Sequence, residues 1–326
     1  MGVELVTRQI IWNLPTPLDP GMLVHDDPPP TLVQFSGSAP SDEDHRILGE
    51  FLASHPATTV RLYGADLSPD LDYLRHYWSV ARINIDVQGI GSFEPLRVLR
   101  PDLEELTLGP CGRRRLSLAP LEHFTSLRQL VLVRHDRDID VIGRLRTLQR
   151  LTLVSLKLPD LNDFRTLSAL WSFALKLGGT TNLKALPEMG HLRYLEIWRV
   201  NGLSDLSIIR ELHELEYLFL QHLKKVENLP SLAPCQRLRR VHLDRVRIHD
   251  LEAIAAAPQL EELLLLDMPQ LREAEFRVLL GHPTLRAVTA GVHNEKRRAA
   301  IRAMLGLNDV PSYGTDFQFS SGERVA

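Results

Sequence analysis

Leucine and other aliphatic residues recur along most of this chain in a six-residue pattern, LxxLxL, which begins anew every 21 to 25 residues. Side chains of a strand alternate between two faces, so the fourth and sixth positions share one face. Each segment therefore predicts a short strand that buries an aliphatic face. Eleven segments fit the pattern, the first two and the last more loosely, and they start at Ala57, Val80, Leu103, Leu127, Leu148, Leu170, Leu192, Leu215, Leu238, Leu260 and Leu285.

A second apolar pattern lies between these strand segments. Before the segment at Leu260, the residues Val246, Ile248, Leu251 and Ile254 are aliphatic and two or three positions apart. Such spacing suits a short helix or 3-10 turn that presents one face to a core. Strand, turn and short helix at a nearly constant period predict a solenoid, whose units pack on their neighbours rather than around one central core.

These segments and their period resemble the leucine-rich repeat family, in particular its short-repeat branch typified by internalins and the phosphatase regulator SDS22. The resemblance covers about residues 57 to 290. It implies an α/β leucine-rich repeat solenoid, a horseshoe or arc with a long parallel sheet on the concave face and short helices or 3-10 turns on the convex face. The family places Asn or Cys at the ninth repeat position, where this chain has Cys111 once and otherwise mostly apolar residues. The loop hydrogen bonds must therefore find other partners.

The ends of a solenoid expose apolar flanks, so we expect caps at both termini. Residues 1–56 are expected to form an N-terminal segment and cap, with a helix that starts where Ser41 and Asp44 have capping-box spacing. Residues 57–292 hold the eleven repeats. Residues 293–310 are expected to form a C-terminal capping helix from Asn294 to Gly306, and residues 311–326 a loose tail.

The third, fifth and seventh positions of each segment must face away from the buried aliphatic side, which in the resembled family is the concave face. In two successive repeats these positions are largely aromatic, and the next two add Arg, His and Leu. Aromatic residues and Arg are enriched at interface hot spots, and clustered exposed apolar surface marks interaction sites. We therefore predict an exposed partner-binding patch formed by Tyr194, Trp198, Tyr217, Phe219, Arg240, His242, Leu264 and Leu266.

Two alternative roles for these aromatic residues stay open at the level of sequence. Cross-strand aromatic pairs can simply stabilise a sheet, or a terminal segment can fold over them. Arg199, His222 and Arg245 occupy the eighth positions of the same repeats. They would either rim the patch or be ordinary solvated loop charges.

Composition narrows the class of partner. The formal charge of −3, from 38 basic and 41 acidic residues, gives no overall attraction to a phosphate backbone, so we expect no nucleic-acid partner. Cys111 and Cys235 are far apart and lack metal-site spacing, which indicates buried thiols in a reducing compartment. No leader or membrane-spanning run is recognisable, so a cytoplasmic location without membrane contact is expected.

The sequence carries no signature of catalysis, cofactor binding or a metal site: HExxH, GxSxG, GxxxxGK[ST] and GxGxxG are all absent. The basic run Arg113 to Arg115 is expected to be a solvated loop. The leading hypothesis is a non-enzymatic scaffold that binds a protein partner on the concave face. The alternatives are a ligand-binding or enzymatic protein whose site lies where a terminal segment meets the solenoid, and a neutralising, immunity-type binder in a bacterial conflict system.

Overall fold

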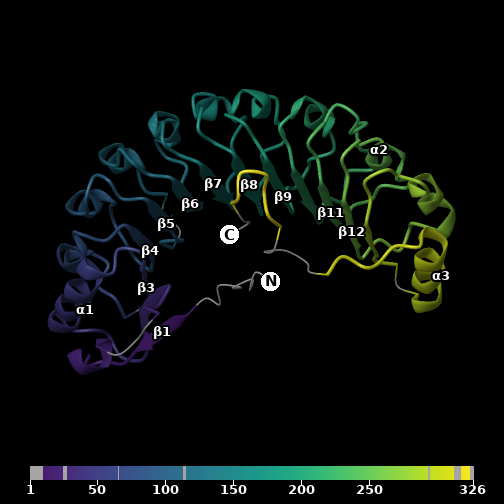
Figure 1. Ribbon diagram of the computed structural model, residues 1–326. Coiled ribbons are helices and arrows are strands. Elements are labelled where there is room, and N and C mark those ends of the chain that lie inside the picture. The colour runs from purple at the N-terminus through teal and green to yellow at the C-terminus, as the bar shows by residue number, and fades with distance from the viewer. Residues whose placement is uncertain are drawn as a thin grey trace. The chain divides into compact units, whose positions relative to one another are not determined.

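Thirteen parallel strands follow one another in chain order, β1 to β13, in the part of the chain that the structure describes (Figure 1). The computed structural model describes residues 10–24, 28–64, 66–112, 115–292, 294–311 and 317–323. The chain divides into two compact units, Met1–Leu148 and Gln149–Ala326. All eleven predicted segments form strands, and two strands that the pattern did not predict, β1 (Ile11–Leu14) and β2 (Leu32–Phe35), precede them.

Each predicted strand begins at the third position of its segment. The first unit continues with β3 (Thr59–Gly64), β4 (Arg82–Val87), β5 (Glu105–Leu108) and β6 (Gln129–Val133). The second unit holds β7 (Arg150–Val154), β8 (Ser172–Lys176), β9 (Tyr194–Trp198), β10 (Tyr217–Gln221), β11 (Arg240–Asp244), β12 (Glu262–Leu266) and β13 (Ala287–Ala290). Equivalent positions pair across neighbouring strands, as Tyr194 does with Tyr217 and Tyr217 with Arg240.

Short helices connect the strands and, within each unit, lie along one side of the sheet (Figure 1). In the first unit they are η1 (Pro20–Leu23), α1 (Asp42–Ser54), η2 (Asp72–Tyr77), η3 (Glu94–Val98), η4 (Ala119–His123) and η5 (Ile139–Arg144). In the second unit they are η6 (Asn162–Phe164), η7 (Leu186–Glu188), η8 (Ser207–Glu211), α2 (Glu252–Ala255), η9 (Glu273–Leu279) and α3 (Glu295–Leu305). Among the described residues, no helix combines the length and the apolar character that crossing a membrane requires.

The aliphatic positions of the pattern form the core between strands and helices. In the repeat of β9, Leu192, Leu195 and Ile197 are buried, and the equivalent residues of the other complete repeats are buried as well. Each buried aliphatic side chain stabilises the fold by roughly 1.5–3 kcal/mol relative to an exposed one. The third, fifth and seventh positions point to the opposite side, which we call the open face of the sheet.

In place of an Asn ladder, the backbone itself makes one set of hydrogen bonds where the strands end. Directly after each strand from β6 to β12, a residue other than glycine adopts the left-handed conformation, with φ between 50° and 68°. After β7 to β11 the N–H of this residue extends the sheet by one bond: Leu177 N–H donates to Trp198 O, and Arg199 N–H to Gln221 O, each at 2.8 Å. Such a φ costs roughly 1 kcal/mol or more for an L-residue, and in these repeats the added bond offsets it.

One side chain at a ninth repeat position does act as a ladder residue. His135 is fully buried, its Nδ1 accepts from Leu116 N–H at 3.3 Å, and its Nε2 lies 3.1 Å from Gly109 O. Because Nδ1 is the acceptor, Nε2 carries the proton and donates to Gly109. Burial lowers the pKa of His135 below its ordinary value, which favours this neutral form.

The helices α1 and α3 both begin at side-chain caps. At the start of α1, Ser41 Oγ accepts from Asp44 N–H at 3.2 Å while Asp44 Oδ2 accepts from Ser41 N–H at 2.7 Å. At the start of α3, Asn294 Oδ1 accepts from Arg297 N–H at 3.0 Å, and Gly306 ends the helix with φ 65°. A left-handed residue just after a helix favours glycine because other residues are strained there.

Replacing His135 with Ala should lower the free energy of unfolding by about 3 kcal/mol, because it leaves the buried Leu116 N–H without its side-chain acceptor and the Gly109 C=O with only the weak bond from Cys111 Sγ. The measurement is urea unfolding followed by circular dichroism. His135→Asn, the residue type the resembled family places at this position, should lose less because an amide can both donate and accept. The exposed His191 is the control, and His191→Ala should change the free energy by no more than about 0.5 kcal/mol. Equal effects at both histidines would contradict the ladder role.

Candidate protein-binding site

The open face of β9 to β12 brings together all eight residues of the predicted patch. Strand pairing places them in three rows across the sheet. Third positions give Tyr194, Tyr217 and Arg240, fifth positions give Phe219, His242 and Leu264, and seventh positions give Trp198 and Leu266. The predicted clustering of these side chains is thus present in the second unit.

The predicted exposure of the patch is wrong for five of these residues. At most 6% of the surface of each remains accessible in Tyr194, Tyr217, Arg240, His242 and Leu264. The other three, Trp198, Phe219 and Leu266, are half-buried. The open face is therefore covered at its centre, and the cover comes from the C-terminal end of the same chain.

Residues 317–323, here called the tail segment, pack on Tyr194 and Tyr217, and Val310 packs on Leu264. A loose tail is therefore the wrong expectation for residues 317–323, whereas 312–316 and 324–326 lie outside the described residues. The alternative in which a terminal segment folds over the aromatic rings is the one the structure has.

Two phenylalanines anchor the tail segment. The ring centroid of Phe317 lies 5.2 Å from that of Tyr217, and the centroid of Phe319 lies 5.1 Å from Trp171 and 6.3 Å from Tyr194. Rings at such separations and inclined angles attract one another by roughly 0.5–1.5 kcal/mol per pair beyond the burial of their surface. Phe317 and Phe319 thus replace water over the aromatic part of the patch.

Arginine side chains complete the two phenylalanine sites. The Arg240 guanidinium lies 5.4 Å from the Tyr217 ring and 5.0 Å from the Phe317 ring, between the sheet and the tail segment. The Arg193 guanidinium likewise lies 5.0 Å from the Trp171 ring and 5.3 Å from the Phe319 ring. Each contact places a cation over the negative face of a ring, which strengthens as water is excluded.

A buried carboxylate receives the tail backbone between these two sites. Glu216, which is 1% exposed, accepts from Ser320 N–H at 2.8 Å and from Ser320 Oγ at 2.6 Å. Arg193 Nε lies 3.4 Å and Arg239 Nη1 3.8 Å from the same carboxylate. A carboxylate taken out of water needs such partners, and Ser320 supplies two of them.

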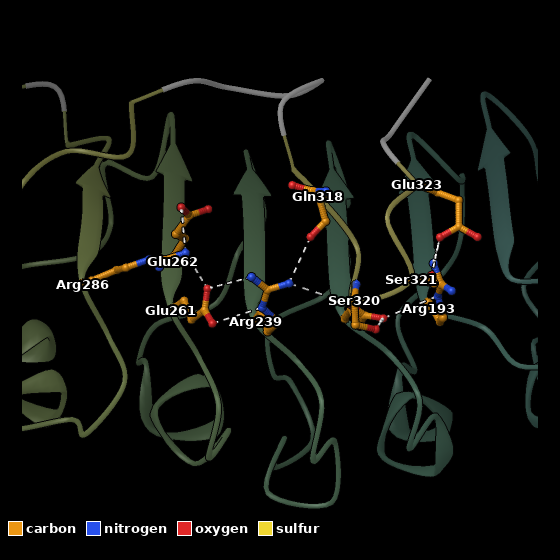
Figure 2. Close-up of polar contacts among 10 residues, drawn as sticks. Arg193, Arg239, Glu261, Glu262, Arg286, Gln318, Ser320, Ser321 and Glu323 are labelled. Carbon is orange, nitrogen blue, oxygen red and sulfur yellow. Dashed lines mark hydrogen bonds and ion pairs between the residues drawn. The ribbon is translucent and has the colours of Figure 1, made fainter. Parts of the chain in front are cut away.

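Two more polar contacts fix the ends of the tail segment, and Figure 2 shows them in place. Arg239 Nη1 donates to the Gln318 carbonyl at 3.0 Å, and Arg193 Nη2 donates to Glu323 at 2.8 Å. Burial raises the pKa of Glu323, but hydrogen bonds from Arg193 and Ser321 outweigh it and hold the pKa below its ordinary value. Glu323 is therefore a carboxylate at neutral pH.

The charged residues that contact the tail segment belong to a regular pattern in the sequence, which our prediction did not use. The second positions of five successive repeats alternate in charge, and ion pairs link each neighbour across the strands: Arg193, Glu216, Arg239, Glu261 and Arg286. The tail segment lies along this row (Figure 2). The alternation FQF at residues 317–319 is the matching signal in the tail, since it places two aromatic side chains on one side of an extended segment.

Beneath the tail segment, a second polar group is held by the sheet alone. Tyr194 Oη donates to Glu196 at 3.0 Å, and Lys176 Nζ lies 2.8 Å from the same carboxylate. Burial, and then the Glu196 charge, raise the pKa of Tyr194 well above its ordinary value, so the hydroxyl stays protonated.

His242 sits at the centre of the fifth-position row. Its ring stacks on Phe219 at 4.1 Å, and its Nδ1 lies 3.3 Å from Tyr217 Oη. Burial, and then the charge of Arg240, lower the pKa of His242 to about 4, so it is neutral at pH 7. Its Nε2 is buried and has no hydrogen-bond partner among the residues that the structure describes.

The predicted rim lies at the edge of the open face where β9 to β11 end. A hollow of about 620 Å³ is lined there by Arg199, His222, Lys224, Lys225 and Arg245, together with residues 200–203. Arg245 donates to His222 Nε2 at 2.6 Å and forms an ion pair with Asp267. This edge is basic, although the chain as a whole is slightly acidic.

The described parts of the chain lack a metal cluster, and a hollow in the first unit contains one serine–histidine contact. No three His, Cys, Asp or Glu side chains there gather closely enough to hold a metal ion. A hollow of about 460 Å³ within residues 12–55 of the first unit is lined by Trp12, Phe51, His55 and other residues. Ser54 Oγ lies 3.1 Å from His55 Nδ1 there, and both groups also bond to the Phe51 carbonyl, at 2.9 and 2.8 Å. Arg113 and Arg114 of the basic run lie outside the described residues.

Comparison with known proteins identifies the fold. No protein-family model matches the sequence, and no curated protein matches it. An internalin, InlF of Listeria monocytogenes str. 4b F2365, is similar over 86% of this chain and 79% of its own, with 19% identity and a TM-score of 0.56. TLR13 in its complex with ssRNA13 is similar over 79% of this chain and 42% of its own, with 14% identity and a TM-score of 0.56. Together with the repeat and the parallel sheet, these similarities identify the fold as a leucine-rich repeat solenoid.

Stability should fall as the pH drops from 6.5 toward 4, in part because of His242. In the unfolded chain this histidine takes up a proton near its ordinary pKa of 6.5, but in the folded chain only near 4. The unfolded state therefore binds more protons in this window, which lowers the free energy of unfolding by up to about 3 kcal/mol at pH 4. Urea unfolding at several pH values measures the slope.

His242→Gln is the variant that isolates this contribution. Burial, and then the charge of His76, also lower the pKa of His45 to about 4, so His45 keeps a pH dependence of its own in both proteins. The variant should therefore show a shallower slope between pH 6.5 and 4 rather than none. Equal slopes for the two proteins would show that His242 makes no contribution.

Proposed function

We propose that this chain is a non-enzymatic scaffold that binds a protein partner on the open face of the sheet in its second unit. One observation carries the proposal: this face already binds a polypeptide, the tail segment, through two aromatic anchors, a backbone carbonyl and a buried carboxylate. A surface that holds seven residues of chain in this way has the chemistry of a peptide-binding face. The aromatic and arginine side chains that it uses are those enriched at interface hot spots.

Part of this face stays accessible beside the tail segment. Trp198, Gln221, Asp244 and Leu266 form a half-buried row at the seventh positions, with Phe219 next to them. The basic hollow adjoins that row at the ends of the strands. We propose that a partner contacts this row, with Trp198 as its anchor, and that acidic groups of the partner meet the basic edge.

We propose a cytoplasmic location for the protein, the compartment that the sequence led us to expect. Cys111 and Cys235 are free thiols, both buried. Burial, and for Cys111 also the charge of Asp86, raise their pKa values to about 11, so neither is a reactive thiolate at neutral pH. Their role is packing, which suits a reducing compartment.

Trp198→Ala should weaken partner binding at least about 30-fold, or about 2 kcal/mol, because it removes the largest accessible apolar side chain of the row. The partner is first captured from lysate of the source organism on the immobilised full chain, and its affinity for purified variants is then measured by calorimetry. Trp78→Ala is the matched control, since Trp78 is 62% exposed in the first unit and lies on no part of this face. Equal affinity for the wild type and Trp198→Ala would reject this face as the partner surface.

A further inference from the structure

We propose that the tail segment occupies the site in place of a partner, and that the partner binds there through a segment of the same chemistry, extended at its two aromatic positions. This inference rests on the proposed function and specifies its ligand. The chemistry is that of FQFSSGE: two aromatic residues separated by one residue, a serine directly after the second, and an acidic residue four positions after that aromatic. Each position is recognised by a separate feature of the sheet.

The first aromatic position is enclosed by one ring and two cations. Phe317 contacts the Tyr217 ring and lies between two guanidinium groups, at 5.0 Å from Arg240 and 5.2 Å from Arg239. Only 4% of Phe317 is exposed. A flat ring fits between cations and another ring, whereas an aliphatic side chain of equal volume would forgo the cation–π attraction.

At the second aromatic position, the Phe319 ring contacts Trp171, Tyr194 and Arg193. Gln318, between the two phenylalanines, points outward and is exposed, so this position admits any side chain. Its carbonyl is nevertheless held by Arg239. The spacing of one residue is therefore required, because successive side chains of an extended segment alternate in direction.

The serine and acidic positions give polar specificity. Ser320 donates both its N–H and its hydroxyl to the buried Glu216, so a residue without a hydroxyl would leave this carboxylate short of a partner. After Ser320 the chain turns back: Gly322 N–H donates to Phe319 O at 2.9 Å with φ 95°, a value that favours glycine. This turn brings Glu323 to Arg193.

The contacts of the tail segment are ones that a second peptide can reproduce. The described tail adds no strand to the sheet, and its attachment consists of two rings, two bonds from Ser320 and single contacts from Arg239 and Arg193. Because the tail is joined to the same chain, it competes at an effective concentration that is typically millimolar. The tail segment makes no described contact with Trp198 in the half-buried row at the seventh positions. A partner that contacts this row as well as the tail's site gains additional binding free energy and so can displace the tail segment.

The test uses the full chain and a fluorescein-labelled peptide, FQFSSGE with blocked ends, in a polarisation titration. Phe317→Ala/Phe319→Ala removes both anchors from the tail without altering the sheet, so this variant should bind the peptide at least about tenfold more tightly than the wild type does. Ser320→Pro is a second way to undock the tail, since it removes both donors to Glu216, and it should give the same result. The matched peptide AQASSGE should bind neither variant.

Adding Arg239→Ala to Ser320→Pro should abolish the gain and thereby place the peptide on this face. No saturable binding to either undocked variant at millimolar peptide, or equal affinity for the wild type and both variants, would overturn the inference. A wild-type dimer in sedimentation analysis that Phe317→Ala/Phe319→Ala abolishes would assign the segment to a second copy, and would overturn it too.

The two proposals can fail separately. If Trp198→Ala weakens partner binding but the peptide does not bind, only the inference that the tail segment occupies the partner's site is rejected. If the peptide binds but Trp198→Ala leaves partner affinity unchanged, the seventh-position row is rejected as the partner surface. Trp198 makes this separation possible because no described contact joins it to the tail segment.

Discussion

The burial of one face of a parallel sheet is the constraint on which the rest of this structure depends. Parallel sheets normally have both faces covered, because their strands are joined by helices that cross over them. In a solenoid all the connections run on one side, so the short helices bury the aliphatic positions and leave the opposite positions to face outward. Whatever stands on the third, fifth and seventh positions must then be polar, be covered by another segment, or serve as a binding surface.

The second unit meets this constraint with its own C-terminal end. Tyr194, Tyr217 and Arg240 lie side by side because the repeats are in register, and left uncovered they would present two aromatic rings and a cation to water. Phe317 and Phe319 cover the rings, and the guanidinium of Arg240 lies between ring faces rather than in bulk solvent. Under the proposed function the same contacts define a peptide site, so the covered face and the proposed binding face are the same surface.

Sequence alone predicted the repeat, the strands, the alternation of faces and the starts of α1 and α3, because each depends on residues close together along the chain. It missed β1 and β2, since neither follows the LxxLxL pattern closely enough to be found by it. It also missed the cover, because the contact between Arg193 and Glu323 spans 130 residues and no local periodicity encodes such a pairing. The eight patch residues were correctly placed together, yet their exposure depends on that distant segment and was therefore wrong for five of them.

The alternating charges at the second positions account for where the cover lies. In neighbouring repeats each Arg lies beside a Glu, so most of these charges are paired within the sheet. Glu216, however, is buried, and the nitrogen atoms of its two arginines lie 3.4 and 3.8 Å from its carboxylate, too far for strong hydrogen bonds. Ser320 donates at 2.6 and 2.8 Å and completes the solvation that water would otherwise provide. Any segment that binds here must therefore bring donors for Glu216 as well as rings for the two aromatic positions. That joint requirement, more than apolar area, is what can make the face selective.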